Sequence, residues 1–312
     1  MENNIIKNYG NKLNLEESEN YLLCGALANI MLTKGRPDFD YWFFSGVTGD
    51  TFTQVFSRNF KNYYDCLSSA VFGKPHLDKI FNACGYEYTL IDNMEFFRNT
   101  EKYLHKIKEW IDKDVPVIVK DTEDSWYSIA VGYENNGNSI LIFDMLGSTP
   151  QECNFNLSEE SNYSLVFVGD MVKEISLAEV YRNAVFDISK LLSKESTSKV
   201  SFGKQAFIDW SKSLLAGRND FLLDYIDWVG INAHMTTFLN RSADFNPNLK
   251  NIIEQLNVFA VEHANLYRRL SDNAEKIINK RKRRIVKEMC KELDEISVKC
   301  QEIVDLLERE HV

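Results

Sequence analysis

The change from strand-like to helix-like patterns near residue 170 constrains the fold of this chain most. Before that point, short apolar or alternating runs predict strands at residues 86–91, 117–119, 126–133, 139–144 and 164–168. An Asn-Gly pair, Asn136 and Gly137, lies between two of these runs and is typical of a β-hairpin. Beyond it the periodicity is helical. We expect an α+β fold, with a small antiparallel sheet in a first domain, residues 1–170, and an all-α domain, residues 171–312.

Composition limits the class of protein. With 312 residues, 44% of them hydrophobic, the chain is long enough for two domains with real cores. A formal net charge of −10 argues against general nucleic-acid binding, which needs an excess of Lys and Arg. The first residues lack the layout of a signal peptide, and no apolar run is long enough to span a bilayer, so we expect a cytoplasmic protein with no membrane association.

The six cysteines are scattered along the chain without a Cys-x-x-Cys pair or a histidine-rich partner segment. This spacing predicts free thiols, and it gives no reason to expect a metal or another cofactor. One of them, Cys24, stands near the start of a helix expected over residues 23–33, where the helix dipole favours the reactive thiolate. The alternative is that Cys24 is an ordinary small residue of a buried helix.

Further helices are expected before and after the change in pattern. Those in the first half cover residues 76–84 and 97–111, and those in the second half cover residues 177–193, 205–215, 221–240, 249–270 and 272–310. Between Ser45 and Phe52, Gly46 and Gly49 predict a tight loop in which backbone can approach a bound group closely. The loop lacks the lysine of a phosphate-binding loop.

The last helix carries an apolar seam and a basic run. The seam repeats at three, four or seven residues from Ile278 to Leu307, as in a packed or coiled helix, and we therefore consider a homodimer through this helix. The basic run is Lys280, Arg281, Lys282, Arg283 and Arg284. It is either a solvated helix surface balanced by nearby glutamates or a docking point for an acidic partner.

Several short motifs, taken in order, resemble one known family. They are a Cys-Gly-Ala-Leu-x-Asn helix start at Cys24, a Ser-Gly-x-x-Gly-x-x-Phe segment at Ser45, a strand ending in Val-Gly-Tyr at Tyr133, the Asn-Gly hairpin, and a strand ending in Asp144. This order resembles papain-like proteins of the bacteriocin-processing C39 type. It is most similar to the butirosin biosynthesis protein H family, in which a papain-like domain precedes a helical domain.

The resemblance implies an acyl transferase of natural-product biosynthesis, which takes an acyl group from a carrier-protein thioester and passes it to a small-molecule amine. Cys24 would then be the nucleophile, and Asp144 would orient the general base. Gly25, Gly46, Gly49 and Trp126 are the candidate substrate contacts. The basic run Lys280–Arg284 would receive the acidic acyl carrier protein.

The chain departs from the family pattern at the general base. The family has a histidine six residues before the glycine of Val-Gly-Tyr, and here that residue is Trp126. Loss of a general base costs about 100- to 10,000-fold in rate, so a cysteine peptidase ranks last, while thioester exchange is less demanding. The other hypothesis is a catalytically inactive papain-like binding module, in which Trp126 stacks on a ligand or fills the cleft.

Each remaining site residue also has an ordinary structural interpretation. His234, on a predicted helix, could reach the cleft only through domain packing, and a core or boundary role is more common for such a histidine. Asp144 could simply form the turn after its strand, and Trp126 could belong to the core.

Overall fold

The structure is a computed structural model that describes residues 3–14, 19, 21–58, 73–121, 126–137, 139–153, 155, 163–218, 235–278 and 282–311. The chain forms two compact units. The sheet unit comprises Met1–Ser45 and Phe72–Ile175, and the helical unit comprises Gly46–Val71 and Ser176–Val312. Residues 46–58 therefore belong with the helices, whereas the sequence assigned them to a contiguous first domain.

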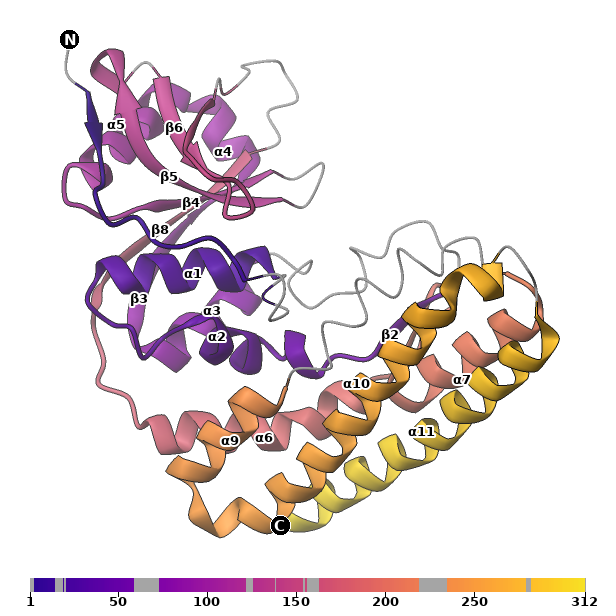
Figure 1. The fold of residues 1–312 in the computed structure, drawn as a ribbon. Helices are drawn as coiled ribbons and strands as arrows, with labels where there is room; N and C mark the ends of the chain where they lie inside the picture. The colour runs from indigo at the N-terminus through magenta and orange to yellow at the C-terminus, as the bar shows by residue number, and fades with distance from the viewer. Residues whose placement is uncertain are drawn as a thin grey trace. The chain divides into compact units, whose positions relative to one another are not determined.

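The sheet unit is built on an antiparallel sheet in the order β3-β8-β4-β5-β6-β7, with β1 paired to β5 (Figure 1). Its strands are β1 (Asn4–Ile5), β3 (Tyr86–Ile91), β4 (Val117–Asp121), β5 (Tyr127–Glu134), β6 (Ser139–Phe143), β7 (Gln151–Cys153) and β8 (Tyr163–Met171). All five predicted strands are confirmed. The hairpin is confirmed too, and its turn η5 (Asn135–Gly137) has positive φ at Asn135, Asn136 and Gly137.

Helices cover both faces of this sheet (Figure 1). The helices of the unit are α1 (Leu22–Thr33), most of α2 (Tyr41–Thr48), α3 (Lys74–Cys84), α4 (Asn93–Arg98) and α5 (Thr100–Ile111). On one face, Phe96 of α4 and Ile107 of α5 belong to the same buried hydrophobic cluster as Val117 and Val119 of β4. Helix α1 packs against β4 and β5 on the other face, where strand alternation puts Ile118.

The helical unit holds the remaining elements. They are η2 (Asp50–Phe52), β2 (Val55–Ser57), α6 (Leu177–Leu192), β9 (Val200–Phe202), α7 (Gly203–Leu215), α9 (Thr236–Phe245), η7 (Pro247–Leu249), α10 (Lys250–Ile278) and α11 (Arg283–Glu310). Helix α6 follows the Ser-x-x-Glu sequence of a capping box, Ser176 to Glu179, and the Ser176 hydroxyl accepts a hydrogen bond from the Glu179 N–H. The fold is thus mixed α and β, with an antiparallel sheet followed by a helical region.

Two expectations for this unit are wrong. The predicted break near residue 271 is absent, because Leu270, Ala274 and Ile277 continue the buried face of α10, and the described chain resumes as α11 only at Arg283. Gly46 does not lie in a loop but in the last turn of α2, and Gly49 caps η2 with a φ of 89°. A β-carbon on Gly46 would lie 2.0 Å from the buried Phe238 ring, so this glycine permits close packing.

Residues 46–58 are held in the helical unit by pairing and by a buried polar group. Strand β2 pairs with β9, and the side chain of Gln54 contacts two residues of α10. The Gln54 Oε1 accepts a hydrogen bond from the Tyr267 hydroxyl at 2.9 Å and lies 2.8 Å from His263 Nε2. Burial lowers the pKa of His263 to about 3, so its imidazole is neutral and Nε2–H donates to Gln54.

Gly46→Ala is expected to destabilise the helical unit by about 1–3 kcal/mol, because the Phe238 ring cannot move away without opening the core. Gly73→Ala is the matched control, since no atom would lie nearer than 3.9 Å to the methyl group that alanine adds there. Urea unfolding of both variants measures the difference. Equal free energies of unfolding for the two would show that Gly46 is not needed for packing.

The neutral His263 makes stability depend on pH. An unfolded histidine binds its proton near pH 6.5, whereas this imidazole resists protonation down to about pH 3, so stability is lost as pH falls through that window. Between about pH 6.5 and pH 3, the free energy of unfolding of His263→Gln is expected to decrease less steeply than that of the wild-type protein, by up to about 1.4 kcal/mol per pH unit. Urea unfolding at several pH values checks this, with His311→Gln at the exposed end of α11 as the control. An unchanged slope in His263→Gln would contradict the assignment.

Candidate functional site

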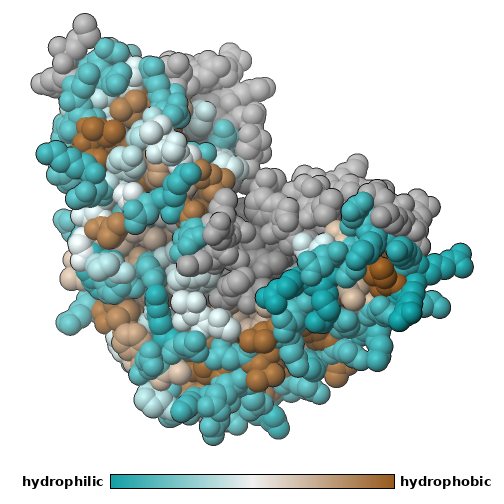
Figure 2. Space-filling view, viewed as in Figure 1, coloured by the Kyte–Doolittle hydropathy of each residue, from teal (hydrophilic) through white to brown (hydrophobic). Residues whose placement is uncertain are grey.

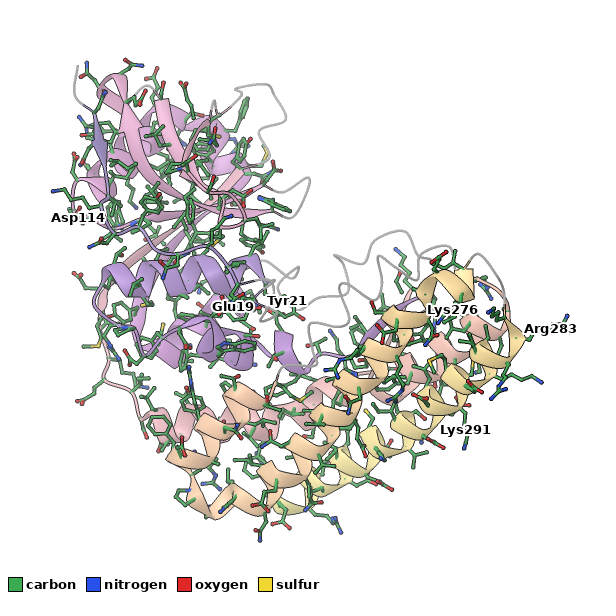
Figure 3. The ribbon with its side chains drawn as sticks, viewed as in Figure 1. Glu19, Tyr21, Asp114, Lys276, Arg283 and Lys291 are labelled. Carbon is green, nitrogen blue, oxygen red and sulfur yellow. The ribbon has the colours of Figure 1, made fainter. Side chains whose placement is uncertain are left out.

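Cys24 stands in the first turn of α1. Helix α1 begins at Leu22, and its first backbone hydrogen bond runs from the Gly25 N–H to the Tyr21 carbonyl at 3.0 Å. The N–H groups of Leu22, Leu23 and Cys24 therefore precede the regular helical bonds and point toward the helix start. The expectation that Cys24 opens a buried helix is confirmed. Its side chain has no exposed surface, and Figure 3 shows Tyr21 and Glu19 beside this end of the helix.

The start of α1 touches the chain that follows β6. A β-carbon on Gly25 would lie 3.2 Å from the Met145 Sδ and 2.3 Å from the Leu13 side chain. The Leu13 N–H donates to the Met145 carbonyl at 3.1 Å. Gly25 therefore has no room for a side chain, and the residue after Cys24 lies against the residue after Asp144.

Asp144 follows β6 directly and is half-buried. Its carboxylate accepts a hydrogen bond from the Leu146 N–H at 3.0 Å, and its carbonyl accepts one from the Gly147 N–H at 2.7 Å. These bonds form a local turn of the kind that Asp favours after a strand. The turn-forming interpretation of Asp144 therefore has direct support from the geometry.

Trp126 directly precedes β5 and is half-buried. Its carbonyl accepts a hydrogen bond from the Asp121 N–H at 2.8 Å, which continues the hairpin between β4 and β5. Because β5 and β6 are antiparallel, with Ile129 opposite Phe143, the start of β5 and the end of β6 lie at the same edge of the sheet. Trp126 and Asp144 are thus positioned by neighbouring strands, as expected.

A groove of about 200 Å³ runs along α1 beside Cys24. Three small or polar residues of the helix line it, Gly25, Ala28 and Asn29, together with Glu19 and Tyr41. Cys24 itself is not among the residues that line this groove, and its side chain is fully buried. The volume suits only a small group, because pockets for drug-sized ligands are usually about 300–1,000 Å³.

Asn29, the last residue of the helix-start motif, has a structural role. Its Oδ1 accepts a hydrogen bond from the Asn11 N–H at 2.8 Å, and its Nδ2 donates to the Asn11 carbonyl at 3.2 Å. This pair of bonds fastens the N-terminal segment along α1. The same segment supplies Leu13, which packs on Gly25.

Sequence reasoning overlooked Lys120. It lies in β4 on the face that α1 covers, is 7% exposed, and its Nζ lies 5.7 Å from the centre of the Tyr127 ring. Burial lowers the pKa of Lys120, and the Asp121 carboxylate partly opposes that shift. The available signal was a lysine directly after the apolar run of residues 117–119.

The other candidate residues belong to the helical unit or lie outside the described residues. Gly46 and Gly49 belong to the helical unit, where their faces pack on Phe238 and Leu191. His234, Lys280 and Arg281 lie outside the described residues. Lys282, Arg283 and Arg284 are exposed at the start of α11, and Arg284 pairs with Glu288 at 2.9 Å.

The described ranges hold neither a metal site nor a membrane segment. Within them, no group of three or more His, Cys, Asp or Glu residues is arranged to hold a metal ion. None of the described helices combines the length and the apolar character that a bilayer-spanning segment requires. The five described cysteines form no disulfide with one another.

No family model matches the chain, and no curated protein matches it.

Proposed function

We propose that the sheet unit is a papain-like domain in which Cys24 takes part in thioester-dependent acyl transfer. The observation that carries the proposal is the position of Cys24 in the first turn of α1, next to the chain that leaves β6. Backbone N–H groups at a helix start can stabilise both a thiolate and a developing oxyanion. The family resemblance of the sequence supplies the reaction, a cytoplasmic step of natural-product biosynthesis.

The reaction has two covalent steps. The Cys24 thiolate attacks the carbonyl carbon of a carrier-bound thioester, a new C–S bond forms, and the carrier leaves as a thiolate that takes up a proton. An amine then attacks the acyl-cysteine, the C–N bond forms, and the Cys24 sulfur leaves. The proton lost by the amine goes to solvent or to a nearby base. The groove beside Gly25 is large enough for a small acyl group or amine.

A second candidate is a catalytically inactive binding module with the same fold. Two observations favour it: Cys24 has no exposed surface, and the residue at the family's histidine position is Trp126. In this case the only role of Asp144 is to form the turn after β6. A peptidase ranks below both, because amide hydrolysis depends on the missing general base.

Incubation with small acyl-thioesters is expected to add one acyl group to the protein, and Cys24→Ala is expected to abolish the adduct. Intact mass spectrometry measures it. Cys84→Ala is the matched control in the same unit, because burial raises the pKa of the Cys84 thiol to about 12 and makes it unreactive. An adduct that persists in Cys24→Ala would contradict the proposal. Its absence from the folded wild-type protein with every thioester would favour the binding module.

Substitutions of Asp144 separate the turn from catalysis. Asp144→Asn is expected to leave the free energy of unfolding nearly unchanged, because an asparagine side chain can form the same turn. Its rate of Cys24 acylation is expected to stay within about three-fold of the wild-type rate. Asp144→Ala is expected to lose about 1 kcal/mol of stability with the hydrogen bond to Leu146. Thermal unfolding and the acylation time course measure both effects. A loss of acylation in Asp144→Asn of about 100-fold or more would instead assign the carboxylate a catalytic role.

A further inference from the structure

A row of three buried polar side chains crosses the sheet on the face that α1 covers. The strand register pairs Lys120 of β4 with Ser164 of β8 on one side and with Tyr127 of β5 on the other. Val119 and Leu165 belong to the hydrophobic cluster of the opposite face, so alternation along the strands places the row on the α1 side. Lys120, Tyr127 and Ser164 are 7%, 3% and 5% exposed. An amine and two hydroxyl groups therefore share this part of the interior.

Lysine is the unusual member of the row, because lysine side chains are rarely buried. Figure 2 shows hydrophilic residues, in teal, over much of one side of the sheet unit, which is where lysines are ordinarily found. The Lys120 Nζ lies 5.7 Å from the centre of the Tyr127 ring, within the range of a cation–π contact. Burial lowers the pKa of Lys120, and the Asp121 carboxylate partly opposes that shift. A buried lysine of this kind can exchange a proton near neutral pH.

The row leads from Lys120 to the first turn of α1. The register of β5 with β6, continued by one pair past the end of β6, brings Tyr127 level with Met145. A β-carbon on Gly25, the residue after Cys24, would lie 3.2 Å from the Met145 Sδ. Neighbouring strands are about 4.8 Å apart, so the backbone of Lys120 lies ~10 Å from that of Met145 along the row. The flexible four-carbon stem of a lysine spans ~6 Å of such a distance.

We propose that Lys120 exchanges protons with the Cys24 thiol during the reaction, an inference that rests on the proposed acyl transfer. The indole of Trp126, at the position where the family pattern has its histidine, only donates hydrogen bonds and cannot act as a base. A neutral lysine amine accepts a proton, and the ammonium that forms can give it up again. Lys120 is thus both general base and general acid.

Protons balance over the two covalent steps. In the first step, the Lys120 Nζ takes the proton of the Cys24 thiol, the sulfur forms the C–S bond to the acyl carbon, and the departing carrier sulfur takes the proton from Nζ. In the second step, Nζ takes a proton from the attacking amine as the C–N bond forms, and it returns that proton to the Cys24 sulfur as the C–S bond breaks. The cycle ends with a neutral amine and a protonated thiol, as it began.

A purely structural amine is the alternative, and Lys34 at the other end of α1 provides an example. The Lys34 Nζ donates to the Gly169 carbonyl at 2.7 Å and lies 5.5 Å from the centre of the Tyr86 ring. Burial lowers the pKa of Lys34 as well. Because Lys34 follows Cys24 by ten residues, it lies ~15 Å away along the helix. It is therefore the matched control, with the same surroundings at the wrong end of α1.

The first test measures how fast a small acyl-thioester acylates Cys24 in the full chain, by intact mass. Lys120→Met keeps an apolar stem without the amine and is expected to slow acylation by about 100-fold or more. Lys120→Arg keeps a cation that cannot give up its proton, and it is expected to be at least about ten-fold slower than the wild-type protein. Lys34→Met is expected to keep the wild-type rate.

Circular dichroism verifies the fold of each variant, and Lys120→Arg decides the test if Lys120→Met does not fold. A folded Lys120→Met or Lys120→Arg that acylates at the wild-type rate would overturn the proposal. An equal loss in Lys34→Met would do the same, because it would assign the effect to packing of α1.

The second test needs no thioester and therefore separates this inference from the proposed acyl transfer. The ultraviolet absorbance of the thiolate is titrated with pH, and the same titration after Cys24→Ala is subtracted. The other titratable groups described at this edge of the sheet are Asp121, Tyr127 and Asp144, and every variant retains them.

Lys120→Met is expected to raise the pKa of Cys24, so that the thiolate fraction at neutral pH falls at least about ten-fold, because the neighbouring ammonium no longer favours the thiolate. Lys120→Arg keeps the cation and is expected to keep the wild-type titration. The same titration in Lys120→Met and in the wild-type protein would overturn the proposal. A raised pKa in Lys120→Met, together with no acylation of the wild-type protein, would support the proton exchange and contradict only the acyl transfer.

Discussion

Burial of β4 and β8 on both faces is the constraint on which the sheet unit depends. Ile118 and Val166 are fully buried on one face, and Val119 and Leu165 are buried on the other, so the sheet needs a cover on each side. Helices α4 and α5 cover one side and α1 covers the other. The candidate nucleophile therefore lies on a helix whose position is fixed by the hydrophobic effect rather than by a catalytic partner.

Local signals predicted strands β3, β4, β5, β6 and β8 and helices α1, α3 and α5 of the sheet unit, but they missed β1, α2, α4 and β7. Gly85 ends α3 with a φ of 77°, and the Asn-Gly turn joins β5 to β6, because each of these residues tolerates a backbone that most others avoid. Long-range features could not be read in the same way. The three-residue strand β2 depends on pairing with β9, which lies far along the chain. Helix α10 continues through Ser271 because the buried face of this helix extends beyond that residue.

At the candidate site, the sequence located the residues but not their surroundings. Cys24 lies at a helix start and Trp126 and Asp144 flank neighbouring strands, as their local patterns predicted. Burial of Cys24, the turn at Asp144 and the buried amine of Lys120 depend on how distant segments pack, which periodicity does not report. Gly46 is a further example: the sequence does not distinguish a glycine that leaves room for a ligand from one that leaves room for a packed aromatic ring such as Phe238.

The pairing of β2 with β9 has a consequence for how the chain folds during synthesis. Strand β2 ends at Ser57, and its partner begins only at Val200, after the whole sheet unit has been made. Ribosomes add about 5–20 residues per second, so β2 waits for its partner for about 7–30 s. Over that interval the apolar side chains of Val55 and Phe56 lack their final cover, and non-local pairing of this kind is intrinsically slow. Completion of the helical unit therefore follows synthesis of the sheet unit.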